Sequence, residues 1–133
     1  MGEIVIADNK LLVTRMLAGE TDWLEQWSAD GVWTIPGSTK WSGIYAGKAE
    51  IARKLLAPMT AEMASLGRFE IENVIAEGNF VVVQGQATGR VTKSGRPYNN
   101  TYCLVYEIVG GKIQRLTEYC DTELITSAFA LPS

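Results

Sequence analysis

The side chains best suited to acid–base chemistry gather near the C-terminal end of the chain, at residues 98–122. A partly desolvated carboxylate can act as a general base toward a weakly acidic C–H group, and nearby amides or phenols can donate hydrogen bonds to the resulting enolate oxygen. The stretch supplies Asp121 as the candidate base, with Asn100 and Tyr102 as candidate donors. The stretch therefore holds the groups that acid–base chemistry on a small molecule would need.

The chain contains no histidine among its 133 residues. Catalysis by Ser-His-Asp or Cys-His groups is thereby excluded, and the commonest metal ligand is missing. The sequence also lacks a Cys-x-x-Cys pair, a glycine-rich phosphate loop and a clustered acidic metal site. We therefore expect the protein to use no cofactor and no metal.

Two β-rich runs in the same stretch flank a glycine pair at 110–111. Adjacent glycines favour a two-residue turn in which both central residues have positive φ, so the runs are predicted to form a hairpin. This register sets Asn100 opposite Asp121 and Tyr102 opposite Tyr119. All four side chains then share one face, because side chains alternate along a strand with period two. Polar groups beside apolar neighbours on one face are typical of a small-molecule pocket.

Each polar residue of this cluster has a second interpretation. A one-residue bulge in the hairpin would exchange the faces beyond it, and Glu118 would then be the carboxylate of the pocket. Without a bulge, Glu118 is expected to be solvated or at an interface. Asp121 is also well suited to cap a helix that begins at Thr122, and Asn100 to be a structural hydrogen-bonding group.

The rest of the chain alternates between helical and extended patterns. Apolar residues at helical spacing predict a long helix at 47–66, and Pro58 requires a kink or a restart because proline removes a backbone hydrogen bond. From residue 68 onward the pattern is that of antiparallel strands joined by tight turns. The other predicted elements are helices at 10–17 and 21–29, a turn at 28–31, a strand at 32–35, a loop at 38–45, strands at 69–76 and 80–92, and a short helix or tail at 124–131.

The strand at 80–92 places small residues beside the polar cluster. Its pairing with the next strand is predicted to set Ala87 opposite Tyr102, with Gly85 on the same face. Small residues here leave volume for a ligand, or they allow the sheet to bend over a helix. Arg90 and Gln86 are predicted on the opposite face.

Aromatic and long apolar side chains elsewhere are candidates for the pocket wall. Aromatic residues on a loop often line a pocket mouth, and they equally often pack against neighbouring helices. The apolar stripe of the helix at 47–66 is expected to be core or pocket wall. The predicted substrate-binding residues are Trp33, Trp41, Tyr45, Met59, Gln86, Glu118 and Tyr119.

Length and composition indicate a single globular domain, residues 1–133. The net charge is −3 and the 12 basic residues are scattered, which argues against a nucleic-acid partner. No apolar run is long enough to span a membrane, and the N-terminus lacks a signal-peptide pattern, so a cytoplasmic location is expected. Cys103 and Cys120 are then predicted to be thiols rather than a disulfide.

The order of helices, a strand, a kinked helix and antiparallel strands predicts an α+β domain. The chain also resembles the nuclear transport factor 2-like superfamily over almost its whole length, in particular SnoaL-like and ketosteroid-isomerase-like proteins. The segments that carry the resemblance are 28–37 (SADGVWTIPG), 42–48 (SGIYAGK), 77–79 (EGN), 111–113 (GKI) and 118–122 (EYCDT).

The resemblance implies a fold and an assembly. The fold is a cone-shaped, curved mixed β-sheet packed against a kinked long helix and short N-terminal helices. The cone encloses an apolar pocket, and two copies are expected to form a homodimer through the sheet.

Departures from the family pattern narrow the implied activity. A ketosteroid isomerase would carry its catalytic aspartate and its oxyanion-hole tyrosine where this chain has Ile35 and Leu12, so steroid isomerisation by that mechanism is excluded. A limonene-epoxide-hydrolase-like protein would carry an Arg-x-Asp pair at Gln84 and Gln86. The SnoaL-like polyketide cyclases use a carboxylate at the position of Asp121 as a base, and this match survives.

Two hypotheses of different class follow. The first is a cofactor-independent enzyme of the SnoaL-like class, an isomerase, cyclase or lyase with Asp121 as base. The second is a non-catalytic module of the same fold that binds an apolar ligand or forms a dimeric scaffold. An epoxide-hydrolase-like enzyme with an altered triad is a further alternative. If the protein is an enzyme or a ligand-binding module, its expected partner is a small apolar molecule.

Overall fold

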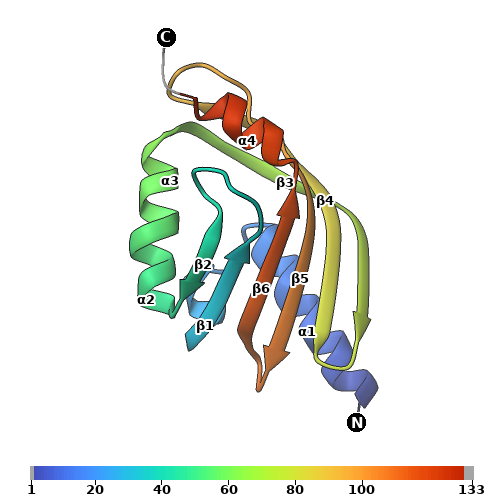
Figure 1. The fold of residues 1–133 in the computed structure, drawn as a ribbon. Coiled ribbons are helices and arrows are strands. Elements are labelled where there is room, and N and C mark those ends of the chain that lie inside the picture. Colours follow the sequence, from blue (N-terminus) through green and yellow to red (C-terminus); the bar gives the residue numbers. More distant parts are fainter. Residues whose placement is uncertain (1, 131–133) are drawn as a thin grey trace.

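The computed structural model describes residues 2–130 and shows a curved six-stranded sheet with helices packed against it (Figure 1). The strand order is β2-β1-β6-β5-β4-β3. Strands β1 and β6 are parallel and the other neighbours are antiparallel, so the sheet is mixed. The helices are α1 (Gly2–Leu17), η1 (Leu24–Gln26), α2 (Lys48–Glu50), η2 (Ile51–Leu56), α3 (Ala57–Ala61) and α4 (Thr122–Ala128), and the strands are β1 (Trp27–Ile35), β2 (Gly43–Ala46), β3 (Met63–Glu77), β4 (Phe80–Thr92), β5 (Thr101–Val109) and β6 (Lys112–Cys120).

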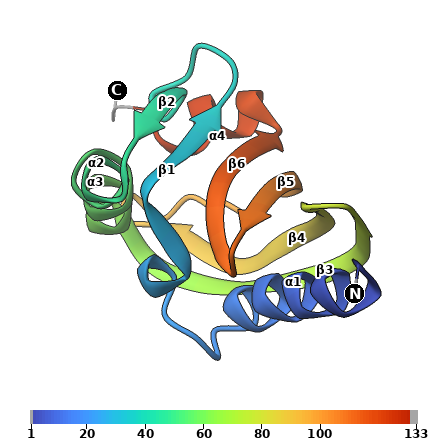
Figure 2. The same cartoon turned by 90° about the horizontal axis from the view of Figure 1, so that it is seen from below.

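The sheet curves strongly from one edge to the other, as the view from below shows (Figure 2). Helix α1 packs against β3 and β4, whereas the continuous helical segment α2-η2-α3 packs near β1 and β2. The core therefore lies between the inner face of the sheet and these helices. This arrangement confirms the α+β class predicted from the order of elements and the curved mixed sheet implied by the resemblance.

Alternating burial along the strands defines the inner face of the sheet. In β5, Tyr102, Leu104, Tyr106 and Ile108 are buried, while the residues between them are at least partly exposed. Fully burying a large apolar side chain contributes roughly 1.5–3 kcal/mol, which is enough to fix the register of each strand. The period-two pattern seen in the sequence is thus the burial pattern of β5.

The predicted kinked helix is present, but it is shorter and it is continuous through the proline. Pro58 lies in the first turn of α3, directly after the π-helical turns of η2. There the N–H of Ala57 donates to the carbonyl of Ala52, five residues earlier. Proline is tolerated in the first turn of a helix, where its missing N–H costs least, and this is the position of Pro58. The helical segment ends at Ala61, so Met63, predicted to be helical, begins β3.

The predicted helix at 21–29 and the predicted turn at 28–31 are both wrong. Only Leu24–Gln26 is helical, and β1 begins at Trp27. Trp27 is 2% exposed and stacks on Trp33, with ring centroids 5.6 Å apart. Burial of the two indoles stabilises an extended backbone that local turn propensity disfavours.

The remaining boundaries differ less from prediction. Strand β4 has the predicted bounds, helix α1 begins eight residues earlier than predicted, and the predicted loop contains the edge strand β2. Helix α4 ends at Ala128, and residue 131 of the predicted tail lies outside the described residues. Within residues 2–130, no helix combines the length and the apolar character needed to cross a membrane.

Candidate active site

A cavity of about 430 Å³ lies between the inner face of the sheet and the helices. Its volume is in the range of small-molecule binding sites. Most of its wall is apolar, with Trp33, Leu55, Leu104 and Leu116 among the lining residues. The polar residues of the lining are Thr60, Arg68, Arg90, Tyr98, Tyr102 and Glu118.

The mouth of the cavity is marked by lining residues that are exposed at the surface. These residues are Gly19 after α1, Thr60 on α3, and Leu66, Gly67 and Arg68 near the start of β3. The cavity thus opens to solvent near the end of α1, α3 and the start of β3.

Among the described residues, Glu118 is the only acidic one that lines the cavity. It lies on β6 opposite Leu104. Burial raises the pKa of its carboxyl group to about 7, although the charge of Arg90 and a hydrogen bond from Cys120 lower that pKa. The side chain is enclosed by protein and keeps some accessible area because it borders the cavity. Both protonation states are therefore populated near neutral pH, as a general base requires.

A β-bulge explains why Glu118 and not Asp121 faces the cavity. The predicted pairing holds next to the turn, but Gln114 is then an extra residue in β6. A bulge exchanges the faces of all residues beyond it. The uninterrupted register is therefore wrong, and the bulged alternative is confirmed. The sequence signal was present, since Ile113 and Leu116 are an odd number of positions apart and both are buried.

Asp121 lies outside the cavity and caps α4. Its side chain is exposed, and Oδ1 accepts hydrogen bonds from the N–H groups of Glu123 and Leu124 at 3.0 and 3.3 Å. This is the capping role that the sequence offered as a second interpretation. The expectation that this carboxylate faces the pocket is therefore wrong, because the carboxylate points at the first turn of the helix.

Asn100 is fully buried, but it is not part of the cavity wall. Its Nδ2 donates to the carbonyl of Asp121 at 3.1 Å and to the hydroxyl of Tyr98 at 3.3 Å. Its Oδ1 accepts from the N–H groups of Thr101 and Asp121 at 2.8 and 3.0 Å. These bonds connect the start of β5 to the end of β6, so the structure assigns Asn100 a structural role rather than a place at the reacting atoms.

Arg90 is a cavity residue that sequence reasoning placed on the wrong face. Gly89 has φ +70° and interrupts the alternation of β4, so Arg90 and Ala87 share the inner side. Arg90 Nε donates to the carbonyl of Leu66 at 3.1 Å, and Nη1 donates to the hydroxyl of Tyr102 at 3.0 Å. A glycine directly before a charged residue near a strand end is the sequence signal of such a bend.

Tyr102 lies in the cavity wall, where the sequence predicted it. Burial, and next the neighbouring Tyr98, raise the pKa of its phenol far above the ordinary value, while the charge of Arg90 opposes the shift. Burial raises the pKa of Tyr98 to about 12. Both phenols are therefore neutral at physiological pH and keep a proton with which to donate a hydrogen bond.

The predicted substrate-binding residues fall into two groups. Those that line the cavity are Trp33, Trp41, Met59 and Glu118. Tyr45 is instead half-buried outside the lining, and its hydroxyl donates to the carbonyl of Trp41 at 2.8 Å. Gln86 and Tyr119 are exposed on the outer face of the sheet, so neither faces the cavity.

The volume predicted above Gly85 is filled by protein. The ring of Phe69 occupies the space that a Cβ on Gly85 would need. Phe69 also packs against Tyr102, with ring centroids 5.8 Å apart. Gly85 pairs with Tyr102 rather than with Leu104, a two-residue shift that leaves the faces of β4 unchanged. The glycine thus permits close packing rather than creating the cavity.

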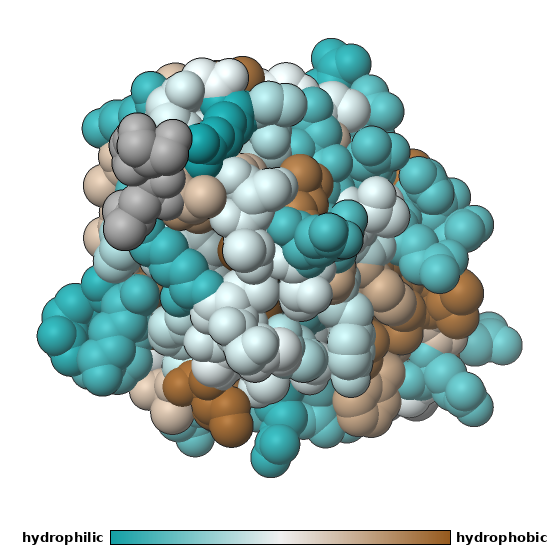
Figure 3. Space-filling view, turned by 45° about the horizontal axis from the view of Figure 1, so that its top comes forward, coloured by the Kyte–Doolittle hydropathy of each residue, from teal (hydrophilic) through white to brown (hydrophobic). Residues whose placement is uncertain are grey.

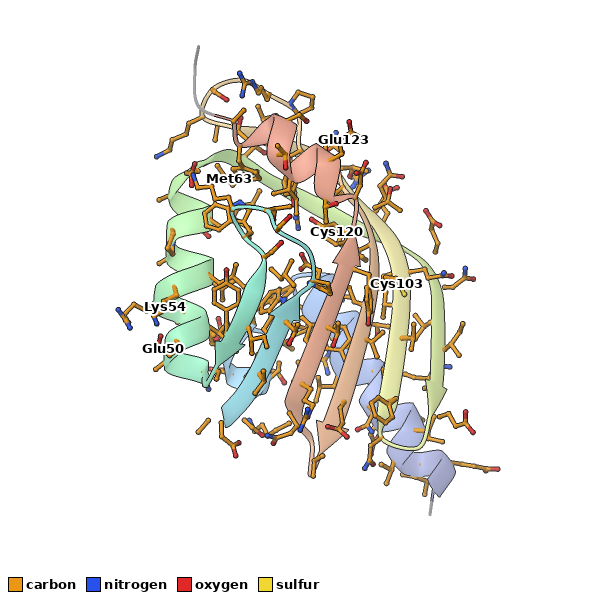
Figure 4. The ribbon with its side chains drawn as sticks, in the orientation of Figure 1. Glu50, Lys54, Met63, Cys103, Cys120 and Glu123 are labelled. Carbon is orange, nitrogen blue, oxygen red and sulfur yellow. The ribbon has the colours of Figure 1, made fainter. Side chains whose placement is uncertain are left out.

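The two cysteines are free thiols on the neighbouring strands β5 and β6 (Figure 4), as predicted. Burial raises the pKa of the Cys120 thiol to about 12, so it stays protonated and is a poor nucleophile. Within residues 2–130, no cluster of three or more acidic or cysteine side chains has the geometry of a metal site.

Comparison with known proteins relates this chain to one family and one fold. The family model of the SnoaL-like domain matches residues 17–116. No curated protein matches the sequence. A proposed isomerase from Bacillus subtilis has a similar structure, with a TM-score of 0.73, 23% sequence identity, and coverage of 97% of this chain and 95% of that chain.

Two further solved structures are similar over nearly their full lengths. A proposed SnoaL-like polyketide cyclase from a Jannaschia species has a TM-score of 0.69 and 16% identity, covering 97% of this chain and 96% of that chain. An NTF2-like protein of unknown function from Burkholderia pseudomallei has a TM-score of 0.73 and 16% identity, covering 98% of each chain. At these identities the structural matches show the shared fold.

Proposed function

Because the chain belongs to the SnoaL-like domain family, we propose that it is a cofactor-independent enzyme whose general base is Glu118. The substrate is a small, apolar carbonyl compound bound in the cavity, and the reaction is of the isomerase, cyclase or lyase type. The observation that carries this proposal is a single carboxyl group in an apolar cavity, sharing the cavity wall with Arg90 and Tyr102. An acid and its complementary donors around one space are the arrangement that carbon-acid chemistry needs.

The proposed first step is proton transfer from carbon to Glu118. The ionised carboxylate takes a proton from the carbon next to the substrate carbonyl, and the C–H electron pair moves into an enolate. The phenol of Tyr102 donates its proton in a hydrogen bond to the enolate oxygen, while Arg90 donates to the phenol oxygen. A donor of this kind stabilises a transition state by roughly 3 kcal/mol. Protonated Glu118 then returns the proton to another atom of the substrate.

The space between the base and the donors supports this assignment. Within the described residues no salt bridge joins Arg90 to Glu118, although both line the same cavity. The cavity that both residues line has a volume of about 430 Å³, which is enough for a small substrate. Two structural neighbours are named as a proposed isomerase and a proposed SnoaL-like polyketide cyclase, which are reaction classes included in this proposal.

The epoxide-hydrolase alternative, which depended on Gln84 and Gln86 of β4, loses its support. Gln84 and Gln86 are exposed on the outer face, so they neither replace catalytic groups in the cavity nor mark an altered hydrolase triad there. Of the predicted catalytic groups, Tyr102 remains in the proposal, whereas Asp121 and Asn100 have structural hydrogen bonds instead.

Proton exchange at carbon tests the proposal without knowledge of the natural substrate. The probe is 2-tetralone, an apolar bicyclic ketone, whose deuterium exchange in D₂O is followed by NMR. The wild-type protein is expected to accelerate exchange, and Glu118→Gln to reduce this acceleration at least ~100-fold, as loss of a general base does. Asp121→Asn, which keeps an N-cap side chain, is the matched control and is expected to retain the wild-type rate. Exchange by Glu118→Gln at the wild-type rate would exclude Glu118 as the base.

A further inference from the structure

Arg90 brings a positive charge into the cavity wall, where its charge acts on the neighbouring Glu118 but forms no salt bridge with it. Its side chain is half-buried, and its hydrogen-bond partners are a backbone carbonyl and a phenol, both neutral. Within residues 2–130 no carboxylate forms a salt bridge with it. Charges that leave bulk water are normally paired, because an unpaired one loses hydration without compensation. The site therefore has an electrostatic place for an anion.

Arg90 also keeps hydrogen-bonding capacity in a fixed orientation. A guanidinium group carries five N–H donors. Arg90 Nε is bound by the carbonyl of Leu66 and Nη1 by the oxygen of Tyr102, and its Cζ lies 5.8 Å from the centroid of the Tyr102 ring. The second N–H of Nη1 and both N–H groups of Nη2 have no protein acceptor among the described residues. Two of these donors can bind both oxygens of one carboxylate.

We propose that the cavity binds an apolar oxo acid whose carboxylate group lies on the free edge of the Arg90 guanidinium. The inference rests on the proposed function for the location of the ligand, and it names the substrate class of that site. The ligand carbonyl is the group that Tyr102 contacts. Because the Tyr102 oxygen and Arg90 Nη1 are 3.0 Å apart, the carbonyl and the carboxylate of the ligand are close neighbours in its structure. The apolar remainder of the ligand fits the wall formed by Trp33, Leu55 and Leu116.

Arg68 provides the matched control for Arg90. It also lines the cavity, but at the exposed mouth, and it already forms a salt bridge with Glu70 at 3.1 Å. A general attraction of anions to positive charge would involve both arginines equally. A specific carboxylate site involves Arg90 alone, because two hydrogen bonds fix its guanidinium group and its remaining N–H donors have no acceptor among the described residues.

Binding of a matched pair of ligands tests the inference by isothermal titration calorimetry. The probes are 2-naphthoate and 2-naphthamide, which share size and shape and differ in charge. The wild-type protein is expected to bind 2-naphthoate at least ~10-fold more tightly, in line with a charge-assisted hydrogen-bond pair. Arg90→Met is expected to abolish this preference while its affinity for 2-naphthamide stays within about threefold. Arg68→Met is expected to keep the preference.

Three results would overturn the carboxylate site. The first is equal affinity of the wild-type protein for both probes, or no binding of 2-naphthoate, a result that needs no variant to fold. The second is a loss of affinity in Arg90→Met that is the same for both probes, which would identify a purely structural arginine. The third is loss of the preference in Arg68→Met. None of these results concerns Glu118, whose role is decided by the 2-tetralone exchange, so the two proposals fail independently.

Discussion

Glu118 and Asp121 are carboxylates at two ends of one short stretch, and their surroundings give them different properties. Glu118 borders an apolar cavity, and burial raises the pKa of its carboxyl group to about 7. Asp121 is exposed and accepts hydrogen bonds from two backbone N–H groups of α4. Desolvation makes the first a usable base at neutral pH, while the second stabilises a helix end.

The free energy of unfolding is expected to depend on pH because the pKa of Glu118 is raised in the folded protein. The folded-state pKa is about 7 and the ordinary value for a glutamate carboxyl group is 4.5, so the folded state holds this proton more tightly than the unfolded state. Its stabilising contribution is complete below the unfolded pKa and is lost as pH rises through 7. Glu118→Gln is therefore expected to gain stability relative to wild type, by about 1–3 kcal/mol, when urea unfolding at pH 5 and pH 8 is compared.

Glu72→Gln is the control for this pH comparison, since Glu72 is exposed on β3. Its effect is expected to be the same at pH 5 and pH 8. A pH-independent difference between wild type and Glu118→Gln would show that the carboxyl group of Glu118 has an ordinary pKa in the folded protein.

At the scale of elements, a bend in the β3–β4 pair positions Arg90. Gly67 and Gly89 lie opposite each other with φ +57° and +70°, conformations that other residues rarely adopt. A Cβ on Gly67 would collide with the carbonyl oxygen of Thr88 on the neighbouring strand. The close approach of the two strands therefore requires glycine at this position, and the bend turns the guanidinium of Arg90 inward.

Gly67→Ala is expected to destabilise the protein more than Gly78→Ala does. The two glycines have nearly the same φ, +57° and +58°, but Gly78 lies in the β3–β4 turn with open space around its Cα. Gly78→Ala is expected to cost about 1–2 kcal/mol for the left-handed conformation alone. Gly67→Ala adds a backbone collision, and the expected cost exceeds that of the turn variant by at least ~2 kcal/mol. Thermal unfolding of both variants measures the difference, and equal costs would contradict the close approach.

At the scale of the whole molecule, the outer face of the sheet carries exposed apolar side chains. Val105 lies opposite Val82, which lies opposite Ile75 on the next strand. Ile75 is 60% exposed and Phe80 is 47% exposed. Figure 3 shows apolar side chains gathered on the side of the molecule where β3 and β4 lie, within a largely hydrophilic surface. Contiguous apolar patches of this kind mark interaction surfaces.

We propose that two copies of the chain associate through this outer face, as the family resemblance implies. Val82→Glu places a charge at the centre of the patch and is expected to convert a dimer into a monomer, because an unpaired carboxylate would be desolvated in the interface. Sedimentation velocity measures the change. Ile4→Glu on α1, where Ile4 is 66% exposed, is the control and is expected to leave the dimer intact. A monomeric wild-type protein would refute the proposal.

Local signals in the sequence determined the elements of the sheet and the class of chemistry. Alternating apolar residues and the glycine pair at 110–111 specified the C-terminal hairpin, because side-chain period and turn geometry are properties of a few adjacent residues. The absence of histidine restricted acid–base chemistry to carboxylates, tyrosines and lysines. The same signals predicted the α+β class and placed Tyr102 on the inner face.

Only the tertiary structure decided which charged groups face the cavity. The extra residue Gln114 allows Ile113 and Leu116 both to be buried, and it turns Glu118 inward. The bend at Gly89 does the same for Arg90. A bulge changes few local contacts but reverses every side chain beyond it, so its position depends on burial summed over neighbouring strands and helices rather than on the residues around it.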